Sequence, residues 1–236
     1  MPLFLSASSI VDFLDCSQRF YYRTTQREQG IDNDDMIVGT IVHYAIEKFW
    51  NDPIKARENV LEQVKFFKLP ATKEGKALTS IDNFFERFSH LLNPDDEIEY
   101  KFKLPLGREV YLVGKMDRIS NGNIFDWKTK TTPPYDISRD IQFILYNEAY
   151  RRIFGKDPIA VYYASLTTGK LLKLNPNLAL TQILFNDIIP TMTQEIKDKL
   201  YYRKGLFTGA CHQCSFKDIC YEEANYVMDS TKFSKK

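Results

Sequence analysis

Apolar residues recur every three or four positions through the first 92 residues of the chain, which is the spacing of amphipathic helices. The pattern predicts four helices and no strand in this part of the sequence. The first helix follows N-cap candidates at Ser6, Ser8 and Ser9, and it places Cys16 near its inward face. The four predicted helices cover about residues 6–20, 39–50, 53–68 and 74–92.

The pattern changes at residue 97, where Val, Leu and Tyr become frequent and polar and apolar residues alternate. Three consecutive strands are predicted, and the turn Asn121-Gly122 joins the last two. A helix, two more strands and a long helix follow, and we expect the polar tail to Lys236 to be frayed. The predicted strands cover residues 97–104, 109–119, 123–130, 159–166 and 170–174, and the helices cover 138–154 and 177–203.

Strands that come together, then a helix, then a strand pair are typical of an α/β fold with a mixed central sheet flanked by helices. At 236 residues and 44% hydrophobic, the chain can bury one substantial core. We therefore expect a single domain over residues 1–236. In it, residues 1–95 are mainly helical, 96–176 form the sheet, and 177–236 carry the C-terminal helix and a cysteine cluster.

Charge and local motifs exclude several classes of protein. The 32 basic and 31 acidic residues give a formal charge of +1, so any surface for nucleic acid must be local. The N-terminus lacks the features of a signal peptide and no stretch is apolar enough to cross a bilayer, which favours a cytoplasmic protein with no membrane partner. The segment Glu74-Gly75-Lys76-Ala77 lacks the frame of a P-loop, so no ATP-driven motor is expected in this chain.

The four cysteines are unevenly distributed. Cys211, Cys214 and Cys220 lie close together, with C-x2-C spacing that favours a metal site in a reducing compartment. Cys16 taken alone is better interpreted as a buried thiol that acts as a small hydrophobic side chain. If all four bind one metal centre, the site closes a very long loop and removes much of the freedom of the unfolded chain. Thiolate spacing alone does not distinguish zinc from iron–sulfur.

A second candidate site lies between the cysteines. Asp117 falls on one predicted strand, while Asp126 and Lys128 are two apart on the next strand and share a face. Phe125 and Trp127 flank Asp126, and an uncompensated charge in such an apolar strand is costly. Two carboxylates beside a lysine suit Mg²⁺ or Mn²⁺. On spacing alone, an Asp–Lys ion pair on a solvated sheet face is an equal alternative.

Three further residues carry less information when each is taken alone. His43 lies on a predicted helix, where a lone histidine is usually structural. Gln142 and Tyr146 are four apart on a later helix and therefore share a face.

Taken in order, these motifs resemble the RecB-type branch of the PD-(D/E)XK nuclease superfamily. The most similar subgroup is the iron–sulfur one, which includes the CRISPR-associated RecB-like exonucleases and the nuclease domain of AddB. The resemblance runs from Ser6 to Cys220. Its motifs are Ser6-x-Ser8-x-Ile10 with Cys16-x3-Phe20, Gly39-x3-His43, Gly114-x2-Asp117-Arg118, Asp126-x-Lys128-Thr129, Gln142-x3-Tyr146 and Cys211-x2-Cys214-x5-Cys220.

The resemblance implies a restriction-endonuclease-like fold and a metal-dependent DNA exonuclease that acts on single strands or overhangs. It assigns the divalent metal to His43, Asp117, Asp126 and the carbonyl of Trp127, and the attacking water to Lys128. Glu99 on the preceding strand is a further candidate for the site. Gln142 and Tyr146 would steady the lysine or the DNA, and Cys16, Cys211, Cys214 and Cys220 would bind a structural 4Fe-4S cluster.

The chain departs from the family pattern in two places. Met116 stands where the superfamily name has proline, and Asp126 stands where many members have glutamate; both variants are familiar in the RecB branch. Helicase, recombination or CRISPR proteins are the expected partners besides DNA. The alternatives are an inactive nuclease-fold module that binds DNA or a protein, and a zinc site in a structural protein. The candidate DNA contacts are Arg19, Arg23, Lys101, Lys130, Tyr201, Tyr202, Arg203 and Lys204.

Overall fold

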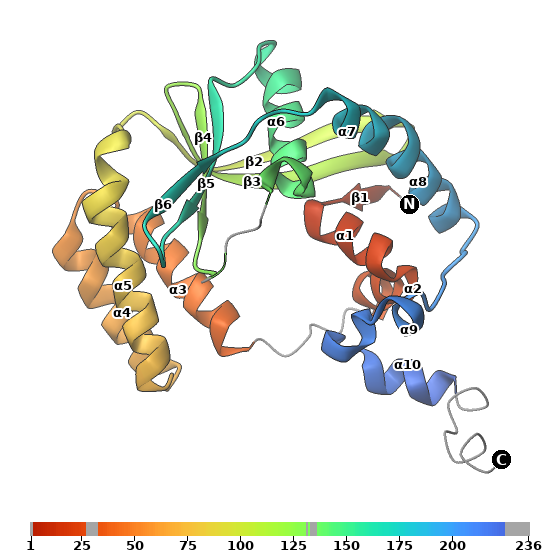
Figure 1. The fold of residues 1–236 in the computed structure, drawn as a ribbon, viewed down its shortest axis with the longest axis horizontal. Coiled ribbons are helices and arrows are strands. Elements are labelled where there is room, and N and C mark those ends of the chain that lie inside the picture. Colours follow the sequence, from red (N-terminus) through yellow and green to blue (C-terminus); the bar gives the residue numbers. More distant parts are fainter. Residues whose placement is uncertain (1, 27–32, 131, 133–135, 225–236) are drawn as a thin grey trace. The chain divides into compact units, whose positions relative to one another are not determined.

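The computed structural model describes residues 2–26, 33–130, 132 and 136–224 (Figure 1). The tail after residue 224, which we expect to be frayed, lies outside these residues. The chain divides into two compact units, and each is described separately below. The first unit comprises residues 1–7 and 32–187, and the second comprises residues 8–31 and 188–236.

The first unit contains a mixed six-stranded sheet. Its order is β1-β3-β4-β5-β6, and β2 also pairs with β3. The β2–β3, β3–β4 and β5–β6 pairs are antiparallel, whereas β1–β3 and β4–β5 are parallel. The strands are β1 (Leu3–Leu5), β2 (Glu97–Gly107), β3 (Val110–Ser120), β4 (Asn123–Lys128), β5 (Ala160–Ser165) and β6 (Lys170–Lys173). The predicted mixed sheet flanked by helices is thus confirmed.

Helices cover both faces of the sheet at β4 and β5. Phe125 stacks on Tyr162 and on Trp127, and these rings belong to the core that α3, α4 and α5 share with the sheet. Tyr163, the next residue on β5, points to the opposite face, where its ring lies 5.9 Å from that of Phe143. The helices of this unit are α3 (Asp34–Phe49), α4 (Pro53–Phe66), α5 (Ala71–Arg87), α6 (Ile141–Phe154) and α7 (Leu178–Gln182).

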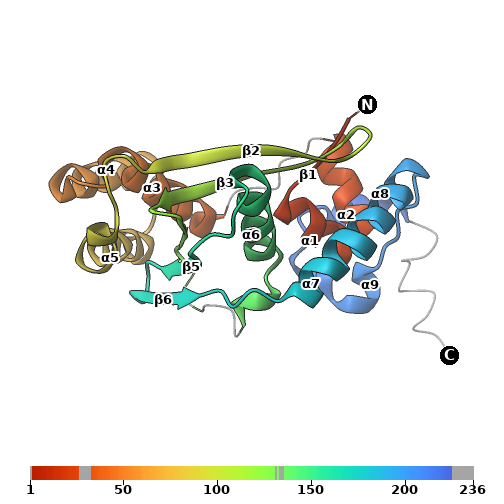
Figure 2. The same cartoon turned by 90° about the horizontal axis from the view of Figure 1, so that it is seen from above.

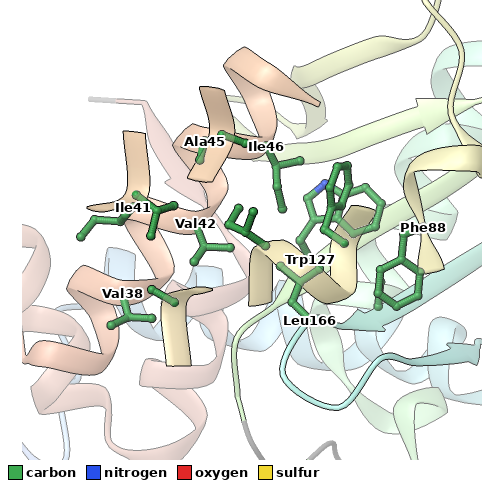
Figure 3. Packing of buried hydrophobic residues seen from close by; sticks show 14 of the residues in the cluster. Val38, Ile41, Val42, Ala45, Ile46, Phe88, Trp127 and Leu166 are labelled. Carbon is green, nitrogen blue, oxygen red and sulfur yellow. The ribbon is translucent and has the colours of Figure 1, made fainter. Parts of the chain in front are cut away.

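The core between the sheet and helices α3 to α5 is apolar and closely packed (Figure 3). Val42 on α3 is fully buried, and Trp127 on β4 lies edge-on to Phe84 with ring centroids 5.4 Å apart. Burial of side chains of this size stabilises a fold by about 1.5–3 kcal/mol each. This packing holds α3, and with it His43, against the end of β4.

Two predictions about the first unit need correction. The first 92 residues are not all helical, because β1 pairs in parallel with the start of β3 through Leu3–Val110 and Leu5–Leu112. Three residues are too few to show a period, so the pattern could not reveal this strand. The predicted helix at 39–50 begins earlier, at Asp34, where Asn33 caps it by accepting a hydrogen bond from the Met36 N–H.

The second unit brings together two segments that are far apart in the sequence. One contains α1 (Ala7–Asp15), α2 (Ser17–Tyr21) and the π-helical turn Tyr22–Gln26. The other contains α8 (Ile189–Lys197), α9 (Gly205–Thr208), a 3-10 turn at Ala210–Gln213 and α10 (Lys217–Glu223). Backbone contacts join them: Tyr202 N donates to Ser17 Oγ at 2.7 Å and Gln18 N donates to the Tyr202 carbonyl at 3.2 Å.

Two long helices predicted from the sequence are broken. Cys16 is not within a helix; it is an extended residue with φ −164° that precedes α2, although its predicted burial is confirmed at 8% exposure. The predicted helix at 177–203 is interrupted by a π-helical turn at Ile183–Ile188, just before Pro190. Proline has no N–H to donate to the preceding turn, which explains the break. None of the helices in the described residues has the length and apolarity needed to span a bilayer.

Candidate functional site

The site in the first unit begins where β3 and β4 separate. Their ladder pairs Arg118–Ser120 with Asn123–Phe125. Beyond it, the Asp117 side chain takes the place of a backbone partner, since its Oδ2 accepts a hydrogen bond from the Trp127 N–H at 2.8 Å. The predicted proximity of Asp117 to the second strand is therefore observed.

Three side chains converge at this point from three elements. Ligand atoms of His43 on α3, Glu99 on β2 and Asp117 on β3 all lie within 4.8 Å of one another. His43 Nδ1 is 3.6 Å from Asp117 Oδ2, and its Nε2 is 2.8 Å from the Trp127 carbonyl oxygen. One imidazole and two carboxylates form a donor set that could hold a divalent metal.

Glu99 occupies an unusual backbone conformation. Its φ is +54°, although the residues on either side pair regularly with β3 through Ile98–Arg118 and Tyr100–Met116. Left-handed backbone is uncommon for residues other than glycine, and such strain concentrates at functional sites. Glu99 also forms an ion pair with Lys115. Sequence reasoning missed Lys115, and its position two residues before Asp117 on the same strand was the available signal.

A hydrogen-bonded network around Gln142 adjoins these residues, since the charges of Asp117 and His43 both act on Asp126. Gln142 on α6 accepts from Lys128 Nζ at 2.8 Å and donates to Asp126 Oδ1 at 3.0 Å. It also lies 2.6 Å from the Tyr146 hydroxyl, which in turn donates to the Lys115 carbonyl at 2.5 Å. The shared faces of Gln142 with Tyr146 and of Asp126 with Lys128 are both observed, and Lys128 Nζ lies 2.7 Å from Asp126 Oδ2. The solvated sheet face of the alternative is not observed, because Asp126 is buried.

Burial dominates the electrostatics of this network. Asp126 is 1% exposed, and burial raises its pKa to about 6 despite the opposing charge of Lys128. Burial alone would lower the pKa of Lys128, but the carboxylates of Asp126 and Asp117 outweigh it and raise that pKa. Lys128 is therefore a protonated ammonium at neutral pH.

One buried oxygen of the network lacks a hydrogen bond. Within the described residues, Asp126 Oδ2 has no hydrogen-bond donor in suitable geometry, although the Lys128 ammonium is close to it. The Lys128 ammonium compensates the charge of this oxygen but does not satisfy its hydrogen bonding, so the oxygen could accept a further ligand. This atom and the set of His43, Glu99 and Asp117 fit a divalent cation.

The four cysteines line one small cavity in the second unit, together with Arg19 and Arg203. Burial raises the pKa of the Cys211 thiol, and the neighbouring thiols Cys16, Cys214 and Cys220 raise it further. A Cβ atom on Gly205 would lie 3.0 Å from Cys211 Sγ, so the backbone approaches this sulfur closely. The predicted association of Cys16 with the C-terminal cysteines is observed.

The spacing of the thiols bears on what they could hold. All four belong to the described residues, and no three of their sulfurs lie within 4.8 Å of one another. A tetrahedral zinc ion with Zn–S bonds of about 2.3 Å would place its sulfurs about 3.8 Å apart. The buried Nε atoms of Arg19 and Arg203 have no hydrogen-bond acceptor within the part of the chain described. The cavity thus offers four thiols and two donors that have no acceptor among the described residues, a set that could hold a metal centre.

The predicted DNA contacts in the second unit are engaged in local interactions. Arg19 and Arg23 both pair with the buried Asp12, at 2.8 and 2.5 Å. Tyr201 packs against Tyr21, Arg203 lies 3.6 Å from Glu223, and the Lys204 ammonium lies over the rings of Phe13 and Tyr202. These residues support the cysteine-bearing unit in the described structure.

The remaining two candidates belong to the first unit. Lys101 is exposed on β2. Lys130 lines an open hollow together with Lys73 and Lys76 of α5, which share the carboxylate of Asp35 at 2.7 Å each. Sequence reasoning did not group the lysines of α5 with Lys130, because 54 residues separate Lys76 from Lys130.

The chain was compared with models of known protein families. A family model described as the PD-(D/E)XK nuclease superfamily matches residues 4–221. None of the curated proteins compared with the chain matches it.

Proposed function

Because the chain belongs to the PD-(D/E)XK nuclease superfamily, we propose that it is a metal-dependent deoxyribonuclease that hydrolyses phosphodiester bonds. One observation carries the proposal: His43, Glu99 and Asp117 converge within 4.8 Å beside the buried Asp126–Lys128 pair. A site that joins hard oxygen ligands to a fixed ammonium meets the two needs of phosphodiester hydrolysis. It neutralises the charge on the phosphate and supplies a nucleophile near neutral pH.

In this proposal, His43, Asp117, Asp126 and the Trp127 carbonyl hold Mg²⁺ or Mn²⁺, and Glu99 completes the set. The His43 imidazole and the Trp127 carbonyl lie side by side, with Nε2 2.8 Å from the carbonyl oxygen, so both would be close to an ion held by Asp117. When bound, the ion would supply charge neutralisation and lower the pKa of a coordinated water.

Lys128 is assigned to positioning. Its raised pKa keeps it protonated, so it is suited to orient the attacking water and to stabilise negative charge that develops on the phosphate, and unsuited to act as a general base. Gln142 supports this role, because it bonds the ammonium through Oε1 and Asp126 through Nε2. Tyr146 holds Gln142 in place.

We further propose that the enzyme is an exonuclease that acts on single-stranded DNA or overhangs, and that its setting is the cytoplasm. Where duplex must be unwound, the motor would come from a partner of helicase type, and recombination, repair and CRISPR systems are the proposed contexts. The cysteines would bind a structural 4Fe-4S cluster, for which the support is the wide spacing of the thiols and the unsatisfied Nε atoms of Arg19 and Arg203 within the described residues.

The proposal is tested with purified protein and DNA that carries a different label at each end. We expect cleavage with Mg²⁺ or Mn²⁺ that a chelator abolishes, and a preference for single-stranded ends. The two labels report polarity in the same experiment. Tight binding without turnover of either single- or double-stranded DNA, in protein with an intact cluster, would instead select a binding module of nuclease fold.

Two substitutions test the assigned residues. Asp117→Ala and Lys128→Ala should each lower the cleavage rate by at least about 100-fold, which is typical when a preorganised electrostatic group is removed. Asp82→Ala and Lys170→Ala are matched controls, since Asp82 pairs with Arg57 on the surface and Lys170 is exposed on β6. Full activity in either test variant, or equal loss in the controls, would remove the assignment.

The metal in the cysteine site is decided separately. Anaerobically purified protein should be brown and contain iron and sulfide. Colourless protein with stoichiometric zinc would replace the iron–sulfur proposal with a zinc site, without affecting the nuclease assignment.

A further inference from the structure

The exposed face of β2 and β3 carries a row of basic residues that starts at the candidate metal site. Figure 2 shows β2 and β3 as a long pair with α3 near one end and β1 near the other. Along β2, Lys101 and Lys103 are exposed while the intervening Phe102 is 7% exposed, so the two lysines share the solvent face.

The strand register connects this row to the site. Lys101 pairs across the ladder with Lys115, which forms the ion pair with Glu99. Lys103 is the next position along the face and pairs with Val113. The two pairs that follow Glu99 along this face, Lys101–Lys115 and Lys103–Val113, therefore contain three lysines and no acidic residue. Among the described residues, neither Lys101 nor Lys103 has a carboxylate within ion-pair distance.

The row ends at an aromatic pair in which Phe4 is exposed and Tyr111 is partly buried. Phe4 on β1 stacks on Tyr111 on β3, with ring centroids 5.6 Å apart and an angle of 23° between the planes. The Lys103 ammonium lies 4.2 Å from the centre of the Tyr111 ring and 5.0 Å from that of Phe4. Phe4 is 47% exposed, so a large apolar ring faces solvent next to a positive charge.

We infer that this row, Lys115, Lys101, Lys103, Tyr111 and Phe4, is a binding track for single-stranded DNA that leads into the metal site; the inference rests on the proposed nuclease function. Lysines that follow a backbone and aromatic rings that stack on bases are the two components of single-strand binding surfaces. Paired bases in a duplex cannot present their faces to Phe4 and Tyr111. The charge and the exposed rings therefore favour a single strand.

The length of the track fits several nucleotides. Asp117 and Tyr111 are six residues apart on β3, which corresponds to about 20 Å at 3.3 Å per residue. At a rise of about 3.4 Å per stacked nucleotide, this distance accommodates about six nucleotides. Strands shorter than this should not reach the aromatic pair.

The test measures binding of a labelled 12-nucleotide oligothymidine in the presence of a chelator, so that no cleavage occurs. The double variant Lys101→Ala/Lys103→Ala should reduce the slope of log affinity against log salt by about 1.4, at about 0.7 for each phosphate that is no longer neutralised. Phe4→Ala should weaken binding by about 5- to 150-fold, the effect of removing one base-stacking ring.

Matched controls are available in the same unit. Lys170→Ala/Lys173→Ala removes two lysines from the exposed positions of β6, and Phe66→Ala removes an exposed ring from α4. Both controls should bind as the wild type does, and thermal melts should show all variants folded. The track would be refuted if the β2 and Phe4 variants kept the wild-type affinity and salt slope. It would also be refuted if these variants lost as much affinity for blunt duplex as for the single strand.

The outcomes separate this inference from the proposed function. Wild-type protein that cleaves DNA with Mg²⁺ or Mn²⁺ while the β2 and Phe4 variants bind normally would refute the track and leave the nuclease intact. Protein that cleaves no DNA but binds the single strand through these residues would refute the nuclease and support the track.

Discussion

Replacing Asp126 by asparagine should make the stability of the metal-free protein less dependent on pH. The carboxyl is buried, and its pKa in the folded state is about 6, against about 3.9 in an unfolded chain. An acid whose pKa is raised by folding contributes its full stability below the unfolded-state value. That stability is lost as the pH rises through the folded-state value. The window for this group is therefore about pH 4 to 6.

The magnitude follows from the size of the shift. Two pKa units correspond to about 3 kcal/mol, because one unit is worth about 1.4 kcal/mol. The unfolding free energy of Asp126→Asn minus that of the wild type should thus rise by about 3 kcal/mol between pH 3.5 and pH 8. Any effect of the asparagine that does not depend on pH, such as a changed contact with Lys128, is already present at the lowest pH. It therefore cancels when the difference is compared between two pH values. For a chain of this length the rise corresponds to about 6–12 °C in Tm.

Thermal melts of both proteins from pH 3.5 to 8 in a chelator measure this difference. Adding Mn²⁺ at pH 7 should then stabilise the wild type more than the variant, since a metal bound to the folded state raises its stability. Asp35→Asn is a control, because hydrogen bonds from Lys73 and Lys76 lower the pKa of Asp35 to about 2. Its stability window therefore lies between about pH 2 and 4, and its difference from the wild type should change little between pH 4 and 8. A difference for Asp126→Asn that does not change with pH would refute the reasoning.

Two further predictions concern the core and the cysteine site. Gly114→Ala should destabilise the protein by about 1–3 kcal/mol in chemical denaturation, because the new Cβ would lie 2.4 Å from the Phe102 ring. Gly75 lies in the interior of α5, and no atom lies within 4 Å of a Cβ added there. Gly75→Ala should therefore stabilise the protein by about 0.5–1 kcal/mol. A change in unfolding free energy of the same sign for both variants would contradict the packing argument. Cys211→Ser should lower metal content and stability, and it should lower cleavage only as a consequence. A stable variant with full metal content that cannot cleave would require another role for Cys211.

The sequence predicted those elements whose pattern extends over several residues. The three-strand meander was predictable because β2 alternates over eleven residues and the Asn121-Gly122 turn fixes the hairpin that follows. The shared faces of Asp126 with Lys128 and of Gln142 with Tyr146 follow from strand and helix periodicity alone. These pairs account for the predictable part of the candidate site.

Other features depend on tertiary structure that no local pattern encodes. The break of the first helix at Cys16 depends on contacts with Tyr202, which is 186 residues away. The left-handed conformation of Glu99 is unfavourable for its residue type, so only its surroundings can impose it. Where β3 and β4 separate, a hydrogen bond from Trp127 N to the Asp117 side chain takes the place of the ladder, and no local pattern predicts it. Each of these features lies at a candidate site, where local preference and the final structure disagree.

The composition of the second unit determines when it can form during synthesis. Its first segment emerges early, but Cys211 is made 195 residues after Cys16. At about 5–20 residues per second, the ribosome needs about 10–40 s to cover that distance. During this interval the C-terminal partners of α1 and α2 do not yet exist. By its end the whole first unit, including its sheet, has been synthesised. The order of synthesis therefore makes closure of the cysteine cavity a final step of maturation, one that an incomplete chain cannot reach.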